Sequence, residues 1–498
     1  MQSTNSEAKC TAEGQAITMN NLTCSQLNEV FSSMLGPKGS NKCLVNGGNM
    51  LNITKDGVTV CKEVPFSQPT ASVITNAGKN VYEQLGDGVT SFVIQTTDVF
   101  MESFKMYQDG APITKIVEGL QLAIRDVIQY IKDLTVPLDD ILLRNIALSI
   151  LKSKIKEPDH LLNIIMSSIK AVEIDKKMVE IVKMDGGDLN ESKFIDGLVL
   201  DHSGRHLDMP KSLENVCILT TNISMEYEQP EISSAFTFSS IKERIEMAIT
   251  ENDYIAKRAN KIAEIAKELK EEGKSLLVVS ERGIDTNSLS ILADAGVLAL
   301  RRAKRSNMDR ITKMCGGSIV TTYEGINREM LGYCNKVSVI EMDEEKCTFI
   351  EGVPFKTSCT ILIRGSIDFK RIQVLMKGII TSLRQVIKDK ICIRGGKTLY
   401  LNLITKLQSK LETIEDPSKI LGYKILISVY ENFIKTFLRN EGAVIYKEMA
   451  KLKVNGEDER IFENVRVVEN VLSNSVYNAI SLLMCDEMVV TGKQLKID

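Results

Sequence analysis

One short stretch, Leu85-Gly86-Asp87-Gly88-Val89-Thr90-Ser91, combines the residue types that suit a phosphate and its metal ion. The glycines allow positive φ angles and let a ligand approach the backbone, and the Asp87 carboxylate is a hard oxygen ligand of the kind that magnesium prefers. Thr90 and Ser91 add hydroxyl groups. The same pattern is also typical of a plain helix-to-helix turn with Asp as an N-cap, so by itself it is weak evidence for a site.

The residues on either side of this stretch predict two helices. Pro69 begins a segment with apolar residues at helical spacing that ends at Gly86. A second helical pattern follows, with Phe92, Phe100 and Phe104 on one face. The first N–H groups of this second helix lack partners within the helix and lie at its positive end, which favours an anion there.

Two other glycine-containing turns lie upstream. Leu35-Gly36-Pro37-Lys38-Gly39 closes a helical segment and suits either a phosphate loop or an ordinary C-cap. Lys55-Asp56-Gly57 precedes Val58-Thr59-Val60, and we interpret it as the turn of a hairpin between Leu51–Ile53 and Val58–Val60. An Asp-Gly pair is common in turns without any function.

Composition predicts a soluble globular protein. The 498 residues suggest about three domains. The chain is 43% hydrophobic and 26% charged with a net charge of −3, which does not favour nucleic acid as a partner. Residues 1–10 do not read as a signal peptide, and no apolar run approaches the roughly 20 residues that a membrane span needs, so no membrane partner is expected.

Cysteine and histidine usage predicts an intracellular chain without a zinc site. The 11 cysteines contain no C-x-x-C pair, which is typical of reduced thiols in the cytoplasm. Among only 3 histidines, His202 and His206 are four residues apart, but the Ser-Gly between them argues against a helix that would align them as ligands. We therefore expect a cytoplasmic protein.

The order of elements predicts a discontinuous domain. Helical patterns fill both ends of the chain, including residues 113–131 and 465–484, whereas strands alternate with helices from about residue 198. The middle contains a long charged helix at 241–272 and a strand at 360–365 followed by a further helix. Phe236 and Phe238 precede the long helix and suit either a projection toward a partner or packing on the domain.

Six motifs in the same order give the chain a family resemblance. They are Leu35-Gly-Pro-Lys-Gly39, Asp56-Gly57 with Thr59, Gly86-Asp-Gly88 with Thr90-Ser91, Gly197-Leu-Val-Leu-Asp-His202, Gly283-Ile-Asp285 and Cys315-Gly-Gly317. With these motifs the chain resembles the group II chaperonins, which include the eukaryotic cytosolic chaperonin. The run Ala299–Arg310 is similar to one subunit type of that complex in particular.

The resemblance implies a multidomain α+β and α/β fold with three nested domains. A mostly helical equatorial ATP-binding domain would comprise 1–133 and 395–498, a small intermediate hinge domain 134–195 and 361–394, and an α/β apical domain 196–360. The apical domain would bind substrate and carry a helical protrusion, roughly 229–254, that forms part of a lid. The resemblance also implies an ATP-driven double ring in which seven other paralogous subunits join this one in each eight-membered ring and non-native client proteins fold.

The resemblance also implies roles for individual residues toward ATP or ADP and Mg²⁺. Asp87 would be the metal ligand, Asp56 a catalytic carboxylate near the γ-phosphate, Lys154 a sensor of that phosphate, and Glu463 a partner of the ribose hydroxyls. The remaining nucleotide-binding residues would be Leu35, Gly36, Pro37, Lys38, Gly57, Thr59, Gly86, Gly88, Val89, Thr90, Ser91, Gly395 and Gly396.

The chain departs from the family pattern at one catalytic position. Family members have an aspartate two residues before a Leu-Arg pair in the helix after the 360–365 strand, and here that position is Thr381. A threonine hydroxyl cannot act as a base near neutral pH, and losing such a base costs about 10²–10⁴ in rate. The subunit is therefore expected either to hydrolyse ATP in the ring or to bind nucleotide as a structural and allosteric member. A Thr381→Asp exchange would be expected to raise its turnover in the second case.

An independent nucleotide-dependent enzyme such as a kinase is disfavoured because the sequence contains no Walker pattern. The basic run Arg301-Arg302-Ala303-Lys304-Arg305 suits either the substrate-facing side of a chamber or a solvated connection.

Overall fold

The computed structural model describes residues 9–10, 14–45, 51–155, 157–172, 178–184, 186–227, 240–342, 345–365, 369–455 and 461–490. By its internal contacts the chain divides into two compact units, 1–162 with 370–498, and 163–369. The first unit joins the two ends of the chain, and the second is inserted between them. This arrangement agrees with the predicted fold class. A separate intermediate domain does not emerge from this division, so the three-domain boundaries stay a prediction.

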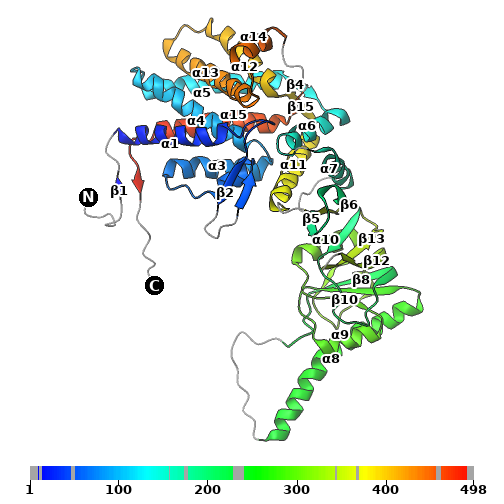
Figure 1. Cartoon of the computed structure of the whole chain (residues 1–498). Coiled ribbons are helices and arrows are strands. Elements are labelled where there is room, and N and C mark those ends of the chain that lie inside the picture. Colours follow the sequence, from blue (N-terminus) through cyan, green and yellow to red (C-terminus); the bar gives the residue numbers. More distant parts are fainter. Residues whose placement is uncertain are drawn as a thin grey trace. The chain divides into compact units, whose positions relative to one another are not determined.

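The first unit is a helical body in which N-terminal and C-terminal segments pack together (Figure 1). Large buried side chains such as Phe31 and Phe92 from the N-terminal part share one core with Tyr423 and Phe433 from the C-terminal part. The helices of this unit are α1 (Gln15–Ser32), α2 (Gly57–Glu63), α3 (Pro69–Leu85), α4 (Val89–Gln108), α5 (Ile113–Asp133), α6 (Asp140–Lys152), α11 (Phe369–Asp389), α12 (Gly396–Leu411), α13 (Pro417–Asn440), α14 (Ile445–Asn455) and α15 (Val465–Leu483), with α7 (Asp159–Ala171) running from this unit into the next.

Local sequence signals set the limits of the helices that position the site. Helix α3 has Pro69 at its start and ends where Gly86 takes a φ of 81°, as the sequence predicted. Helices α5 and α13 approach closely at Gly119 and Gly422, where a Cβ on either residue would overlap the backbone of the other helix. Small residues at this crossing let the core helices pack against one another.

Short strands complete the helical unit. β1 (Lys9–Cys10) pairs with β17 (Val489–Val490), and β2 (Lys42–Val45) forms a hairpin with β3 (Leu51–Thr54). β4 (Thr135–Pro137), β15 (Ile391–Arg394) and β16 (Phe462–Glu463) form a three-stranded sheet.

The hairpin predicted at 51–60 is wrong in its second strand. Val58 to Val60 belong to helix α2, and β3 pairs instead with β2 upstream. All of Gly57 to Cys61 are buried, so tertiary packing overrides the preference of two β-branched valines for a strand.

The second unit contains two sheets. A seven-stranded mixed sheet has the order β10 (Leu298–Leu300), β9 (Ser275–Ser280), β8 (Ser212–Thr221), β12 (Gly332–Met342), β13 (Glu345–Glu351), β7 (Gly197–Leu200), with β11 (Ile319–Val320) also paired to β8. β14 (Cys359–Arg364) lies between β5 (Val179–Met184) and β6 (Lys193–Ile195) in a smaller sheet. Helices α8 (Ile241–Glu271), α9 (Thr286–Asp294) and α10 (Arg305–Cys315) accompany the larger sheet (Figure 1). Phe236 and Phe238 lie outside the described residues.

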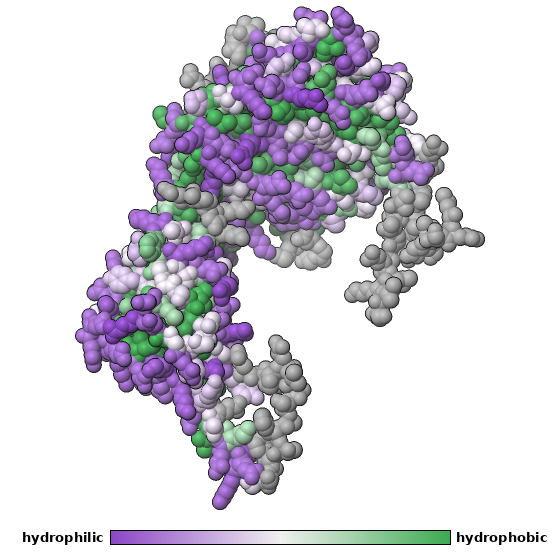
Figure 2. Space-filling model, turned by 180° about the vertical axis from the view of Figure 1, so that it is seen from behind, coloured by the Kyte–Doolittle hydropathy of each residue, from purple (hydrophilic) through white to green (hydrophobic). Residues whose placement is uncertain are grey.

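The face of the molecule drawn in Figure 2 is predominantly polar. Hydrophilic residues cover most of the face drawn in Figure 2, with hydrophobic residues in patches between them. Within the described part of the chain, none of the helices combines the length and the apolar character needed to cross a membrane.

Candidate functional site

The helical unit encloses a cavity of about 910 Å³. Its lining combines segments that are more than 400 residues apart in the sequence. Gly57, Thr59, Gly86 and Gly395 directly adjoin the lining, whereas Thr381 is not part of it. The predicted site residues that line the cavity are Leu35, Gly36, Pro37, Lys38, Asp56, Asp87, Gly88, Val89, Thr90, Ser91, Lys154, Gly396 and Glu463.

The turn between α3 and α4 presents backbone donors to the cavity. Gly86 and Gly88 have φ angles of 81° and 93°, in the left-handed region that favours glycine. A Cβ on Gly88 would lie 2.8 Å from Cγ2 of Val471, so a larger residue would not fit without a shift. Helix α4 begins at Val89, and its first N–H groups, on residues that line the cavity, have no acceptor within the helix. This geometry suits an anion.

The second turn brings a buried carboxylate to the same cavity. Asp56 is 6% exposed, and its Oδ2 accepts a hydrogen bond of 3.0 Å from the Thr59 hydroxyl. Its backbone N–H donates to Oγ1 of Thr54. Gly57 packs so closely on Thr90 that a Cβ would overlap the threonine side chain. The turn at 56–59 is therefore held against the start of α4, where the N–H donors lie.

Lys154 joins the two carboxylates of the cavity. Its Nζ lies 2.7 Å from Oδ1 of Asp56 and 3.7 Å from Oδ1 of Asp87. Burial disfavours the ammonium, but the attraction of Asp56 and Asp87 outweighs that cost and raises the pKa of Lys154 above its usual value. The lysine is therefore a permanent cation between two acids, and it enters the cavity from the end of α6.

The first turn contributes to the opposite wall. Gly36 has a φ of 82°, and Nδ2 of Asn440 donates to the Leu35 carbonyl at 2.9 Å, which fixes the turn to the end of α13. Lys55 donates to the Pro37 carbonyl at 2.6 Å and so links this turn to the one at Asp56. Burial, together with the nearby Arg371 guanidinium, lowers the pKa of Lys55.

Glu463 contacts both residues of the glycine pair Gly395-Gly396 at the start of α12. Oε1 of Glu463 accepts a 3.0 Å hydrogen bond from the Gly396 N–H, and a Cβ on Gly395 would overlap the glutamate side chain. The Gly395 N–H donates to the Ile461 carbonyl. Glu463 thus lines the cavity as predicted, but one of its oxygens is engaged by the backbone of the glycine turn.

Sequence reasoning missed part of this wall. Lys397 forms an ion pair of 2.8 Å with Glu441, and both line the cavity together with Tyr400. The Tyr400 hydroxyl accepts a hydrogen bond of 2.6 Å from Gln95, and burial raises the pKa of Tyr400. No local pattern marks this pair, whose two residues are 44 positions apart in the sequence.

Helix α11 contributes Ser382 to the cavity lining. The Thr381 hydroxyl donates to the Lys377 carbonyl of its own helix, and Ser382 is the residue of α11 that lines the cavity. The helix passes closest to the Gly86 turn at Gly378, where a Cβ would overlap the Gly86 carbonyl. The α11 side chain at the cavity wall is therefore a hydroxyl.

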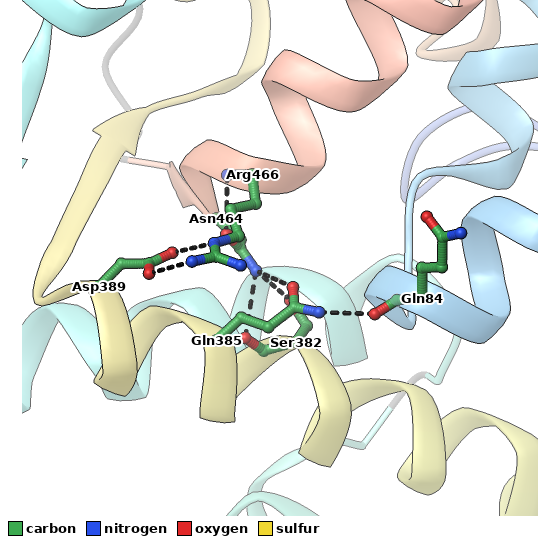
Figure 3. A network of polar contacts seen from close by, with 6 residues as sticks. All are labelled: Gln84, Ser382, Gln385, Asp389, Asn464 and Arg466. Atoms are coloured by element: carbon green, nitrogen blue, oxygen red, sulfur yellow. Dashed lines mark hydrogen bonds and ion pairs between the residues drawn. The ribbon is translucent and has the colours of Figure 1, made fainter.

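A second polar network adjoins the cavity where α11 meets the start of α15 (Figure 3). Asn464 caps α15 by accepting from the Arg466 N–H, and its Nδ2 donates to Oγ of Ser382 at 3.1 Å and to Oε1 of Gln385 at 3.2 Å. Asp389 pairs with the Arg466 guanidinium through both oxygens. This acid, the next one after Thr381 in the helix, is thus committed to a structural pair.

Comparison with known proteins places these features in context. The family model described as the TCP-1/cpn60 chaperonin family matches residues 27–493. The mouse (Mus musculus) T-complex protein 1 subunit zeta-2 is 28% identical over 521 aligned positions that cover 98% of each chain. The predicted resemblance to this family is confirmed, and the particular similarity of the run Ala299–Arg310 to one subunit type stays a prediction.

Proposed function

The chain belongs to the TCP-1/cpn60 chaperonin family, and on this premise we propose that it is a subunit of a cytosolic double ring that assists protein folding through an ATP-driven opening and closing cycle. Seven other paralogous subunits would complete each eight-membered ring, and non-native proteins would be its clients. The equatorial, intermediate and apical boundaries given above belong to this proposal. The lid role of the protrusion, roughly residues 229–254, is also part of this proposal.

One observation carries the nucleotide part of the proposal. Three turns from separate parts of the chain, represented by Gly36, Asp56 and Gly88, line a single cavity of about 910 Å³ beside the open N-terminus of α4. That volume lies at the upper end of the roughly 300–1,000 Å³ of small-molecule sites, as a nucleoside triphosphate requires.

The residues at the phosphate end also fit a magnesium ion. Asp87 and Asp56 supply hard oxygen ligands on the same wall, and magnesium usually takes one or two carboxylates together with substrate phosphates. When bound, the ion would offset the negative charge of the phosphate oxygens. Lys154 would stay between the carboxylates and the phosphates as a fixed cation.

The alternative function, a subunit that binds nucleotide without hydrolysing it, is supported by helix α11. The residue that α11 contributes to the cavity lining is Ser382, which supplies a hydroxyl group and not a carboxylate. Nucleotide occupancy alone can shift a ring between two states if the nucleotide binds one state more tightly. A slow subunit would thus still take part in the cycle.

The nucleotide site is tested by ATP titration of the full chain with and without Mg²⁺. We expect Asp87→Asn to weaken Mg²⁺-dependent ATP binding by about tenfold or more, because it removes a charged ligand at the phosphate end. Asp133→Asn, on the exposed end of α5, is the matched control and should leave binding unchanged. Equal affinities in Asp87→Asn and wild type would refute the site.

The choice between hydrolysis and occupancy is tested by single-turnover ATP cleavage in the assembled ring. If position 381 has the catalytic role that the family resemblance implies, we expect Thr381→Asp to raise the cleavage assigned to this subunit. Ser382→Asp, which places a carboxylate at a residue that lines the cavity, is the comparison variant. Fast cleavage by the wild-type subunit, at the rate of its neighbours, would overturn the alternative.

A further inference from the structure

A second, smaller cavity lies in the unit 163–369. Its volume is about 200 Å³, and it is lined by Asp201, His202, Ser203, Arg205, Arg301 and Arg302. The lining comes from the loops that follow β7 and β10, the two end strands of the sheet order. The first loop reaches β10, since a Cβ on Gly204 would lie 2.9 Å from Cδ1 of Leu298.

The hydrogen-bond partners of His202 indicate that its imidazole ring is in the cationic form. Nδ1 of His202 lies 2.7 Å from Oδ1 of Asp201, and Nε2 lies 3.0 Å from the Arg302 carbonyl oxygen. Both partners can only accept, so both ring nitrogens donate, and only the imidazolium has two donors. The hydrogen bond to Asp201 correspondingly raises the pKa of His202.

Asp201, the acid in the lining, already has its negative charge balanced by two cations. Its Oδ1 is taken by His202, and its Oδ2 lies 3.2 Å from Nζ of Lys304. These partners hold the pKa of Asp201 well below its usual range, so it remains a carboxylate. It orients the cations around it and has little negative charge left to repel an anion.

The backbone conformation of Arg302 accompanies the contact between its carbonyl and His202. Arg302 has a φ of 58°, an uncommon conformation for a residue other than glycine. This conformation accompanies a hydrogen bond of 3.1 Å from its N–H to the Arg282 carbonyl, and it directs the Arg302 carbonyl at His202. Nη1 of Arg301 donates to the Ile284 carbonyl at 3.1 Å, and Arg302 also contacts Glu226 at 3.3 Å. Unusual backbone conformations held by several contacts are found preferentially at functional sites.

Charge and size together define the ligand class. Three arginines and His202 line the cavity with one carboxylate, Asp201, that is already paired, and Glu226 outside the lining pairs with Arg302. Guanidinium groups bind phosphate oxygens through paired, planar hydrogen bonds. A volume of about 200 Å³ is below the range of drug-sized pockets, which suits one phosphate group with a small substituent better than a folded or extended chain. We propose that this cavity binds the phosphate group of a small phosphorylated molecule or free phosphate itself, independently of the nucleotide cavity.

The test is hydrogen exchange of the full chain, followed by mass spectrometry, during titration with pyrophosphate. We expect slower exchange in residues 198–205 and 298–304 of the wild type. Peptide-level readout separates this site from the nucleotide cavity, whose lining lies in other segments. The double variant Arg205→Gln, Arg302→Gln should need at least tenfold more pyrophosphate for the same protection.

Arg305→Gln is the control because it removes a positive charge from an exposed residue that pairs with Glu281 outside the cavity. It should shift the titration less than twofold. The unfolding temperature of each variant checks that the unit remains folded. The proposal would be overturned if millimolar pyrophosphate did not slow hydrogen exchange in these segments of the wild type. It would also be overturned if Arg305→Gln weakened the response to pyrophosphate as much as the double variant does. Protection by a glutamate-rich peptide but not by pyrophosphate would also overturn it, in favour of an acidic protein segment.

Discussion

Two helices of the first unit begin at the cavity of about 910 Å³, and the N–H groups at their N-termini are treated in opposite ways. Helix α15 begins at an asparagine, Asn464, whose side chain caps it and continues into the network of Figure 3. Helix α4 begins after Gly88, which has no side chain to act as a cap. The protein therefore closes one helix terminus itself and leaves the donors of the other for a ligand.

The charges near the two termini follow the same division. Asp389 and Arg466 at α15 form a balanced, bidentate pair. At α4, by contrast, Lys154 faces both Asp56 and Asp87, so the cluster carries a net negative charge on a cavity wall. The same residue types thus form a closed ion pair in one place and, in the proposed function, would bind a cation and phosphates in the other.

The largest effect is expected from Lys154→Met. This change leaves the nearly buried Asp56 without its counter-charge, and breaking such a pair costs about 3 kcal/mol or more of unfolding free energy. Urea unfolding of the full chain measures the loss. Added Mg²⁺ should restore more stability to the variant than to the wild type, because two carboxylates are then available to the ion.

Lys105→Met is the control for that change. Lys105 pairs with Glu102 on the same helical unit, but its side chain is 63% exposed, so the pair contributes at most about 1 kcal/mol. If Lys154→Met lowers the free energy of unfolding by no more than Lys105→Met does, then Lys154 does not stabilise Asp56 and Asp87 as described.

The buried carboxyl group of Asp98 in α4 is expected to make the free energy of unfolding depend on pH, with an effect of intermediate size. Burial raises its pKa to about 7, and the hydrogen bond from Asn28 only partly opposes this. Because the pKa in the folded state exceeds the ordinary value of 3.8, its contribution to stability is fully present below about pH 4 and is lost as pH rises toward 7. A pKa that differs by one between the folded and unfolded chain corresponds to about 1.4 kcal/mol of unfolding free energy.

Asp98→Asn removes this titration. We expect the variant to gain stability relative to the wild type between pH 5 and pH 8, measured as the difference in urea midpoint at each pH. The exposed Asp133→Asn is the control and should show no such trend. A constant difference across this range would show that folding does not raise the pKa of Asp98 as described.

The smallest effects are expected in the closed network. Asn464→Ala removes the cap of α15 and its bonds to Ser382 and Gln385, at a cost of about 1–2 kcal/mol. Arg466→Gln breaks an ion pair whose arginine is 48% exposed and should cost less than about 1 kcal/mol. Neither change should alter the response of thermal stability to Mg²⁺. A changed response would mean that the two helix termini are coupled.

Prediction from sequence succeeded where the signal was local. The helices on both sides of Gly86 and the strands of the inserted unit were predicted because apolar spacing, Pro69 and the glycines act within a few residues. The site residues at 35–38, 56 and 87–91 were named from motifs of the same short kind, and the structure brings them to one cavity. Their roles toward ATP remain proposals.

Prediction failed where packing decided. Val58 and Val60 have the side chains of a strand, yet burial places them in α2. In α11, packing places Ser382 in the cavity lining and Gly378 at the Gly86 turn, which no motif indicated, while the role assigned to position 381 stays a prediction. A count along the sequence cannot determine which side of a helix meets a particular neighbour.

The sequence by itself determined the helices, the glycine turns and the family, because backbone preferences and periodic burial are properties of neighbouring residues. Only the tertiary structure decided that Lys154 lies between Asp56 and Asp87 and that Glu463 closes on Gly396. These contacts join segments tens to hundreds of residues apart, and their distances depend on how whole helices pack, which no local pattern specifies.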